Sequence, residues 1–166
     1  MKGDAMEAPV EIKEIHEGGR KREIAREILE ALPDWFGIPE AREAYISDSE
    51  RQIFFAAMED GSPKGFLCMK ETGKNTVELA VMGVLKELHR RGIGRKLFLA
   101  ARERARKAGY SFLQVKTVEM GRYMEYDATN RFYLSLGFQE FEVFPTLWDE
   151  GNPCQIYVMF LGAEVT

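Results

Sequence analysis

Hydrophobic and polar residues follow the periods of a strand and two helices in the first fifty positions. Residues 10–15 place valine and isoleucine between charged residues, the period of two that is typical of a half-buried strand. Residues 20–32 repeat apolar positions every three or four residues, which predicts an amphipathic helix ended by Pro33. An aromatic loop at residues 34–39 leads into a short predicted helix at residues 39–48. We expect the loop to pack over a sheet, and the alternative is that it lines a substrate pocket.

Short apolar runs separated by glycine-containing turns predict strands in the rest of the chain. These strands are expected at residues 53–58, 64–71, 77–85, 112–118, 138–144 and 155–161. A long helix is predicted from the turn at Gly92 to Ala108, and a short one from Asp127, its expected N-cap, to Gly137. This order of elements predicts an α/β fold with a mixed sheet of about six to seven strands and about four helices.

Nothing in the sequence indicates a second domain, because internal repeats, low-complexity tracts and long linkers are absent. We expect a single domain over residues 1–166, of a size that buries one core without disulfides or metals. Residues 1–9 contain no apolar segment of a signal peptide. They are expected to be disordered or derived from an expression vector, with a natural start at Met6.

The cysteines and histidines exclude several classes of site. Cys68 and Cys154 lie far apart and in no zinc-binding spacing, so we expect a reducing, cytoplasmic location. With His16 and His89 as the only histidines, neither a histidine-rich metal site nor a Ser/His/Asp triad is expected. The longest apolar run, residues 79–85, is far below the ~20 residues that span a bilayer, so no membrane partner is expected.

Positive charge is concentrated in one part of an acidic chain. The net charge is −4, but residues 86–107 contain nine of the 23 lysines and arginines against two glutamates. Such a cluster favours a compact polyanionic ligand over nucleic acid, which binds a broader basic face. The alternative is the solvated face of a helix.

A glycine turn lies within this basic segment, between an apolar strand and the long helix: Leu88-His89-Arg90-Arg91-Gly92-Ile93-Gly94-Arg95-Lys96-Leu97. Glycine lets the backbone approach a ligand, and the first amides of the helix present positive charge to a phosphate. The flanking arginines and Lys96 add charge that suits further phosphates. Because Leu97 replaces the third glycine of a dinucleotide fingerprint and the GxxxxGK[ST] pattern is absent, we expect a pyrophosphate on the turn itself.

Two segments resemble motifs of the GNAT acetyltransferase family. His89-Arg90-Arg91-Gly92-Ile93-Gly94 resembles the Q/R-x-x-G-x-G/A loop that holds the CoA pyrophosphate, with His89 in place of glutamine or arginine. Phe132-Tyr133-Leu134-Ser135-Leu136-Gly137-Phe138 resembles the family's F/L-Y-x-x-x-G-F segment. The resemblance extends over nearly the whole chain and implies the GNAT-like acyl-CoA N-acyltransferase fold. It also implies acetyl-CoA as co-substrate, no metal, and direct acetyl transfer to a primary amine of a small molecule or peptide.

The resemblance further implies roles for individual residues. Glu78 stands 14 residues before Gly92, where some members carry a catalytic glutamate, and Tyr133 resembles the general acid that protonates the CoA thiolate. Gly83 is the expected bulge residue of the strand whose amides polarise the thioester carbonyl. Many members carry an asparagine seven residues before the tyrosine; Tyr126 stands there, and Asn130 is the candidate in its place. The implied cofactor contacts are Met82, Gly83, Val84, His89, Arg90, Arg91, Gly92, Ile93, Gly94, Arg95, Asn130 and Tyr133.

Other interpretations of these residues stay open. Glu78 is otherwise an outward-facing strand residue, Tyr133 a core aromatic and Gly83 a site of close packing. The fallback bases are Glu71, Glu119 and Asp149. An acyl-cysteine intermediate is not expected, because neither cysteine has a basic neighbour in the sequence. The alternative function is a non-catalytic module that senses acetyl-CoA or regulates a partner.

The acceptor is the least determined part of the interpretation. Acidic excess outside the basic segment favours cationic acceptors such as polyamines, aminoglycosides or lysine side chains, without a choice among them. A long connection at residues 119–126 is expected to shape acceptor specificity. The strands after Pro145 and Pro153 are candidates for a homodimer interface, and no nucleic acid partner is expected.

Overall fold

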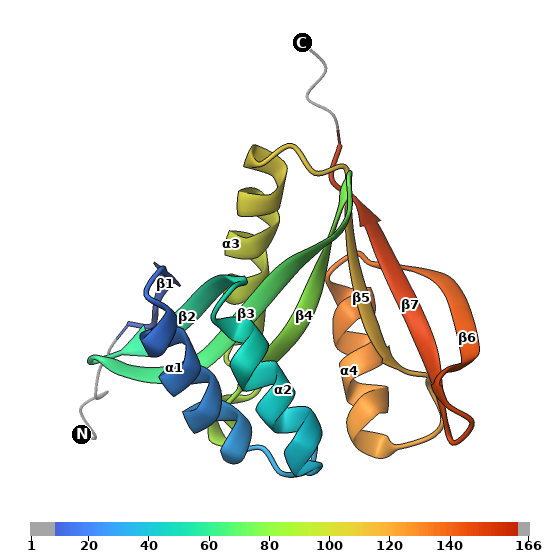
Figure 1. Ribbon diagram of the computed structural model, residues 1–166, viewed down its shortest axis with the longest axis horizontal. Helices are drawn as coiled ribbons and strands as arrows, with labels where there is room; N and C mark the ends of the chain where they lie inside the picture. Colours follow the sequence, from blue (N-terminus) through green and yellow to red (C-terminus); the bar gives the residue numbers. More distant parts are fainter. Residues whose placement is uncertain (1–8, 163–166) are drawn as a thin grey trace, which may run out of the picture.

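The computed structural model describes residues 9–162, which form a seven-stranded sheet with four helices (Figure 1). The strands are β1 (Glu11–Ile15), β2 (Ile53–Glu59), β3 (Ser62–Gly73), β4 (Thr76–Val84), β5 (Phe112–Val118), β6 (Gln139–Asp149) and β7 (Asn152–Phe160). The helices are α1 (Gly18–Glu30), α2 (Pro39–Ser49), α3 (Ile93–Lys107) and α4 (Met124–Ser135), and a 3₁₀ turn, η1 (Lys86–Leu88), precedes α3. The expectation for the first nine residues falls, apart from Pro9, outside the described residues.

The strand order in the sheet is β1-β2-β3-β4-β5-β7-β6. All neighbouring pairs are antiparallel except β4 and β5, which are parallel and joined through α3. This arrangement confirms the predicted mixed α/β fold. No helix within residues 9–162 is long and apolar enough to cross a bilayer.

Two helices begin earlier than the hydrophobic pattern predicts. α1 begins at Gly18 because the carboxylate of Glu17 accepts hydrogen bonds from two first-turn amides, at 2.8 and 2.6 Å. α4 begins at Met124, so Asp127 lies in its first turn and is not its N-cap. The Asp127 carboxylate instead accepts a hydrogen bond of 2.7 Å from the amide of Gly121 and closes the preceding loop. The irregular connection between β5 and α4 is therefore shorter than the predicted one.

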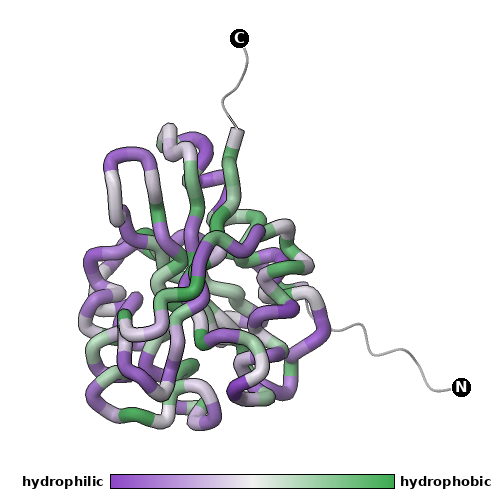
Figure 2. Tube along the Cα trace, turned by 90° about the vertical axis from the view of Figure 1, so that its right-hand side faces the viewer, coloured by the Kyte–Doolittle hydropathy of each residue, from purple (hydrophilic) through white to green (hydrophobic). Residues whose placement is uncertain are grey.

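Two hydrophobic clusters fill the two faces of the sheet. α3 and α4 contribute Leu97, Phe98 and Tyr133 to one cluster, and α1 and α2 contribute Ile28 and Ile46 to the other. Consecutive residues of β3 belong to alternate clusters, since neighbouring side chains of a strand point to opposite faces. In the tube view, hydrophobic residues lie along the central strands and hydrophilic residues are frequent in the outer loops (Figure 2).

β4 and β5 are paired over only part of their length. Their parallel register runs from Thr76 opposite Phe112 to Leu79 opposite Val115 and ends there. On its other side β4 stays paired with β3 as far as Val84. Within the described residues, one edge of β4 therefore has no strand partner beyond Leu79, and the two strands diverge toward the end of the sheet where α3 begins (Figure 1).

The bulge predicted at Gly83 is wrong. The register of β4 against β3 skips Ala80, which is therefore the bulge residue. Gly83 pairs regularly with Phe66, and a Cβ atom on Gly83 would lie 3.0 Å from Leu32 and 3.1 Å from Ile28. Glycine at this position lets α1 pack closely on β4, so the close-packing interpretation of Gly83 is the correct one.

The side chain of Asn130 ties α4 to the sheet. It is fully buried, its amide nitrogen donates to the carbonyls of Val118 at 2.8 Å and Tyr126 at 2.7 Å, and its oxygen accepts from the Tyr157 hydroxyl at 2.6 Å. Its polar groups are used within the protein, which does not favour the predicted contact of Asn130 with a cofactor; that contact stays a prediction.

We expect Asn130→Leu to lower the free energy of unfolding by roughly 2–4 kcal/mol, since it removes three buried hydrogen bonds, including the one to the Tyr157 hydroxyl. Urea unfolding monitored by circular dichroism measures the loss. The exposed Asn75→Ala serves as control and should change stability by less than about 0.5 kcal/mol. A loss below about 1 kcal/mol for Asn130→Leu would contradict the structural role.

Candidate active site

The gap between β4 and β5 is bordered by two helices. α3 follows β4 directly through the turn at residues 85–92, and α4 packs on β5. The two helices meet where a Cβ atom on Gly94 would lie 3.0 Å from the ring of Phe132. Tyr133 of α4 belongs to the hydrophobic cluster that also contains Leu79 and Val115, the last paired residues of the two strands. Tyr133 therefore lies on the same face of the sheet as the last paired residues of the two strands.

The N-terminus of α3 has the properties of an anion site. Gly92 is its N-cap in the left-handed conformation, with φ 77°, and no side chain caps the helix. The first turn contains no acidic residue, and the first intrahelical bond runs from the Lys96 amide to the Gly92 carbonyl. A Cβ atom on Gly92 would have nothing within 4 Å, so the unpaired amides are open to a ligand.

Three residues of the turn also have structural partners. The Nε2 atom of His89 lies 2.7 Å from the Val84 carbonyl oxygen, so His89 holds the turn against the end of β4. Arg95 donates a hydrogen bond of 3.2 Å to the Ser135 carbonyl at the end of α4. Position 94 requires glycine because the ring of Phe132 packs directly over it. The side chains of Arg90 and Arg91 are exposed beside the anion site, and Arg90 has a positive φ of 68°.

Glu78 lies on the face of the sheet that α1 and α2 cover, one residue before β4 and β5 cease to pair. Its side chain is only 7% exposed, and its carboxylate forms ion pairs with Lys116 at 3.3 Å and Lys70 at 3.7 Å. The Oε2 atom is buried and makes no hydrogen bond with another described residue. The interpretation of Glu78 as an outward-facing strand residue is therefore wrong. Because a buried carboxylate oxygen normally has a hydrogen-bond partner, this atom marks a position for a donor.

Tyr133 combines a packed ring with an unpaired hydroxyl. The ring contacts Phe132, Phe138 and Tyr157 with centroid distances of 5.8, 5.8 and 6.2 Å, so the core interpretation holds for the ring. The hydroxyl makes no hydrogen bond with another residue in the described part of the chain. Burial, and to a lesser extent the nearby Tyr45, raises the pKa of Tyr133. The phenol therefore stays protonated at neutral pH.

Tyr45 of α2 was not identified from the sequence. Burial and the charge of Glu78 raise the pKa of Tyr45, and Tyr45 in turn acts on the pKa of Tyr133. Its phenol is therefore near both residues, although Glu78 and Tyr133 approach the gap from opposite faces of the sheet. The pattern of α2 gave no signal, since a tyrosine in a short helix of weak amphipathicity is typical of surface packing.

The fallback bases have partners in other parts of the structure, and the two cysteines are buried. Glu71 interacts with Tyr110, Glu119 pairs with Arg122, and Asp149 accepts hydrogen bonds from the β6–β7 turn. Cys68 and Cys154 are both fully buried, and burial raises the pKa of Cys154 to about 11. Among residues 9–162, no group of three or more His, Cys, Asp or Glu side chains is placed to hold a metal.

Comparisons with known proteins agree with this geometry. A family model described as the acetyltransferase (GNAT) domain matches residues 50–140, more than half of the chain. A search of curated proteins finds no significant match.

Solved structures of similar fold cover almost the entire chain. A protein from Desulfovibrio desulfuricans described as a GNAT-family acetyltransferase has a TM-score of 0.82 and 21% identity, with 93% of this chain and 100% of that chain covered. The ribosomal-protein-S18-alanine N-acetyltransferase from Escherichia coli has a TM-score of 0.74 and 18% identity, with 95% and 99% covered. An aminoglycoside 6'-N-acetyltransferase complexed with coenzyme A has a TM-score of 0.74 and 15% identity, with 94% and 99% covered. At these identities the similarity establishes a common fold.

Proposed function

The chain belongs to the GNAT acetyltransferase family, and from this premise we propose that it transfers the acetyl group of acetyl-CoA to a primary amine by direct attack in a ternary complex. The observation that carries this proposal is the uncapped N-terminus of α3, placed where β4 and β5 separate. A pyrophosphate site and a free strand edge thereby lie next to each other. This combination suits a ligand that has both a diphosphate and an amide-containing arm.

The glycine turn is the proposed site of the CoA pyrophosphate. The amides of Ile93, Gly94 and Arg95 have no intrahelical partner, and the dipole of α3 adds positive potential. Arg90 and Arg91 supply further charge from the exposed side of the turn. Similarity to an acetyltransferase complexed with coenzyme A supports this assignment.

The pantetheine arm is proposed to lie along β4 beyond the bulge. Met82, Gly83 and Val84 keep their pairing with β3 but have no partner in β5. Backbone groups that point to that edge are therefore available to the amides of the arm, apart from the Val84 carbonyl, which His89 contacts. The arm would then end where the strands come together, beside Glu78 and Tyr133. The contacts with Met82 and Val84 are proposed to be mainly through the backbone.

Glu78 is proposed to bind the acceptor ammonium and to accept its proton. An alkylammonium with a pKa of about 10 has no lone pair at neutral pH, so it must lose a proton before it attacks. The Oε2 atom lies 3.7 Å from Lys70 but accepts no hydrogen bond, so it offers an acceptor for one N–H of the ammonium, directly or through a water molecule. Lys70 and Lys116 fix the carboxylate in place from two sides.

The chemical step then needs an acid for the leaving group. The amine nitrogen forms a bond to the thioester carbonyl carbon, the C–S bond breaks, and the sulfur leaves as a thiolate. Tyr133 is proposed to donate its phenolic proton to this sulfur, since the hydroxyl has no other partner. The nitrogen loses its second proton as the amide forms. Of this proton and the one held by Glu78, one reprotonates Tyr133 and the other is released to solvent, which restores the enzyme. A module that only senses acetyl-CoA would need neither group.

We expect Gly92→Ala to weaken acetyl-CoA binding by about tenfold or more, because a Cβ atom would enter the space in front of the unpaired amides. Titration calorimetry measures the dissociation constant. Gly61→Ala is a matched control, since Gly61 has the same φ of 77° and the same open surroundings but lies in the β2–β3 turn. Equal affinities for the two variants, or no binding to the unaltered protein, would exclude the proposed CoA site.

Tyr133→Phe should lower kcat by about 10²-fold while the acetyl-CoA dissociation constant changes less than about twofold, because only the proton donor is removed. Free thiol release in the presence of an amine measures kcat. Since the pKa of Tyr133 is raised, its ionisation should cause no loss of activity below about pH 10 in the unaltered enzyme. Tyr110→Phe, at the closed end of the sheet, is the control. Undiminished kcat for Tyr133→Phe would remove this residue from the mechanism.

Glu78→Gln should lower kcat/KM at pH 7 by about 10²-fold, because the amine must then lose its proton to solvent. The loss should shrink as the pH approaches the amine pKa of about 10, where free amine is abundant. Steady-state rates from pH 6.5 to about 9.5 provide the test, with Glu71→Gln as control. A pH-independent defect would assign Glu78 a structural role in holding Lys70 and Lys116.

A further inference from the structure

The loop between α1 and α2 bridges the two sides of the gap between β4 and β5. On one side the ring of Trp35 contacts His89 edge-to-face at 5.5 Å, and Asp34 pairs with Lys86 at 3.3 Å. On the other side the Tyr126 hydroxyl of α4 donates to the Trp35 carbonyl at 3.3 Å. The loop therefore connects the glycine turn to the start of α4, on the face of the sheet where Glu78 lies.

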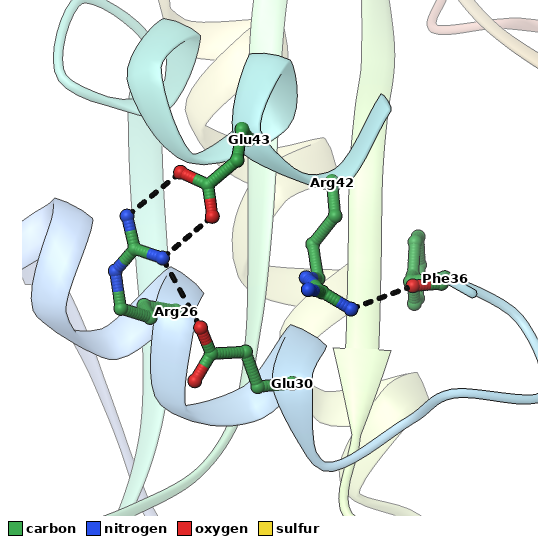
Figure 3. Close-up of polar contacts among 5 residues, drawn as sticks. All are labelled: Arg26, Glu30, Phe36, Arg42 and Glu43. Carbon is green, nitrogen blue, oxygen red and sulfur yellow. Dashed lines mark hydrogen bonds and ion pairs between the residues drawn. The ribbon is translucent and has the colours of Figure 1, made fainter. Parts of the chain in front are cut away.

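The same loop is held from α2. Arg42 donates to the Phe36 carbonyl at 3.3 Å (Figure 3). Arg26 of α1 forms a bidentate pair with Glu43 of α2 at 2.6 and 2.8 Å and also reaches Glu30 at 3.1 Å (Figure 3). These contacts fix α2 against α1, so the loop between them has a defined position.

Large apolar side chains are exposed on both sides of this bridge. Ile38, which follows the loop, is 66% exposed, and Met124 and Tyr123 at the start of α4 are 82% and 45% exposed. Tyr123 contacts Tyr126 with a centroid distance of 6.0 Å, which places it beside the bridging hydrogen bond. Tyr45 of α2 is 37% exposed and contacts Phe36 of the loop edge-to-face at 5.9 Å. We name Ile38, Tyr45, Tyr123 and Met124 the apolar rim.

Three carboxylates near the apolar rim have partners within the protein. Asp34 pairs with Lys86, Glu119 pairs with Arg122, and the Asp127 carboxylate accepts the Gly121 amide. Glu78 has one oxygen that accepts no hydrogen bond, although it lies 3.7 Å from Lys70. The arrangement suits a ligand with one ammonium group and an apolar remainder.

We propose that the acceptor is a primary amine carrying an aromatic or branched aliphatic group, which packs on the apolar rim while its ammonium reaches Glu78. This inference rests on the proposed function and narrows its substrate. It departs from the cationic acceptors that the acidic composition favours. Ile38, Tyr123 and Met124 would remove the apolar group from water. An amine that carries such a group would therefore have a higher kcat/KM than an amine that lacks it.

The test compares 2-phenylethylamine, ethylamine and spermidine as acceptors, with free CoA thiol as the readout. Phenylethylamine should have a kcat/KM at least about tenfold above that of the other two, since its ring buries apolar area that they lack. The double variant Tyr123→Ser, Met124→Ser should lower this value about tenfold and change that for ethylamine less than about twofold. Thermal unfolding and acetyl-CoA affinity confirm that the variant is folded.

Phe160→Ser is the control for loss of an exposed apolar side chain. Phe160 is 66% exposed and pairs with Phe112 at the closed end of the β4–β5 gap, away from the rim. The Phe160→Ser variant should leave the ratio of kcat/KM for phenylethylamine to kcat/KM for ethylamine unchanged. A higher kcat/KM for spermidine, or an unchanged ratio in the double variant, overturns the proposal while acetyl transfer itself stands. If no amine releases thiol although acetyl-CoA binds, the proposed function fails as well.

Discussion

The site depends on the early end of pairing between β4 and β5. The two parallel strands share four residue pairs, and the bulge at Ala80 follows immediately. Backbone amides and carbonyls need partners, so a strand edge that loses its neighbour is a natural place for a ligand with amide groups. α4 packs on β5, and Tyr133 joins the hydrophobic cluster that contains the last paired residues of both strands. One irregularity in the ladder thus creates the proposed binding surface.

The elements and the cofactor turn could be predicted because their signals are local. Periodicity, apolar runs and turn residues located the strands and helices of the described residues, and glycines at 92 and 94 marked the start of α3. The roles of these glycines differ, however. Gly92 adopts a left-handed conformation in open space, whereas Gly94 is required by the ring of Phe132 from another helix. A single sequence does not contain the second kind of information, because it depends on how two helices pack.

The predictions that the structure contradicts or does not favour have the same cause. Asn130 looked like a ligand contact, but the fold places it among the backbone of Val118 and Tyr126 and the Tyr157 hydroxyl, where it is fully buried. The bulge was expected at a glycine, but Ala80 has it, and Gly83 serves the packing of α1. Tyr45 was missed because nothing local relates it to Glu78. Long-range contacts decided each of these positions.

The two halves of the proposed site are encoded differently. The cofactor half is one continuous turn and helix start, whose amides act regardless of most side chains. The acceptor half combines side chains from the α1–α2 loop, α2 and α4. Arg42 bonds the loop from α2, and Tyr126 bonds it from α4. Exposed residues such as Ile38 and Met124 can change with little effect on stability, commonly within about 0.5 kcal/mol. Acceptor preference can therefore vary while the fold and the cofactor turn persist, which explains why the sequence indicated the co-substrate but left the acceptor open.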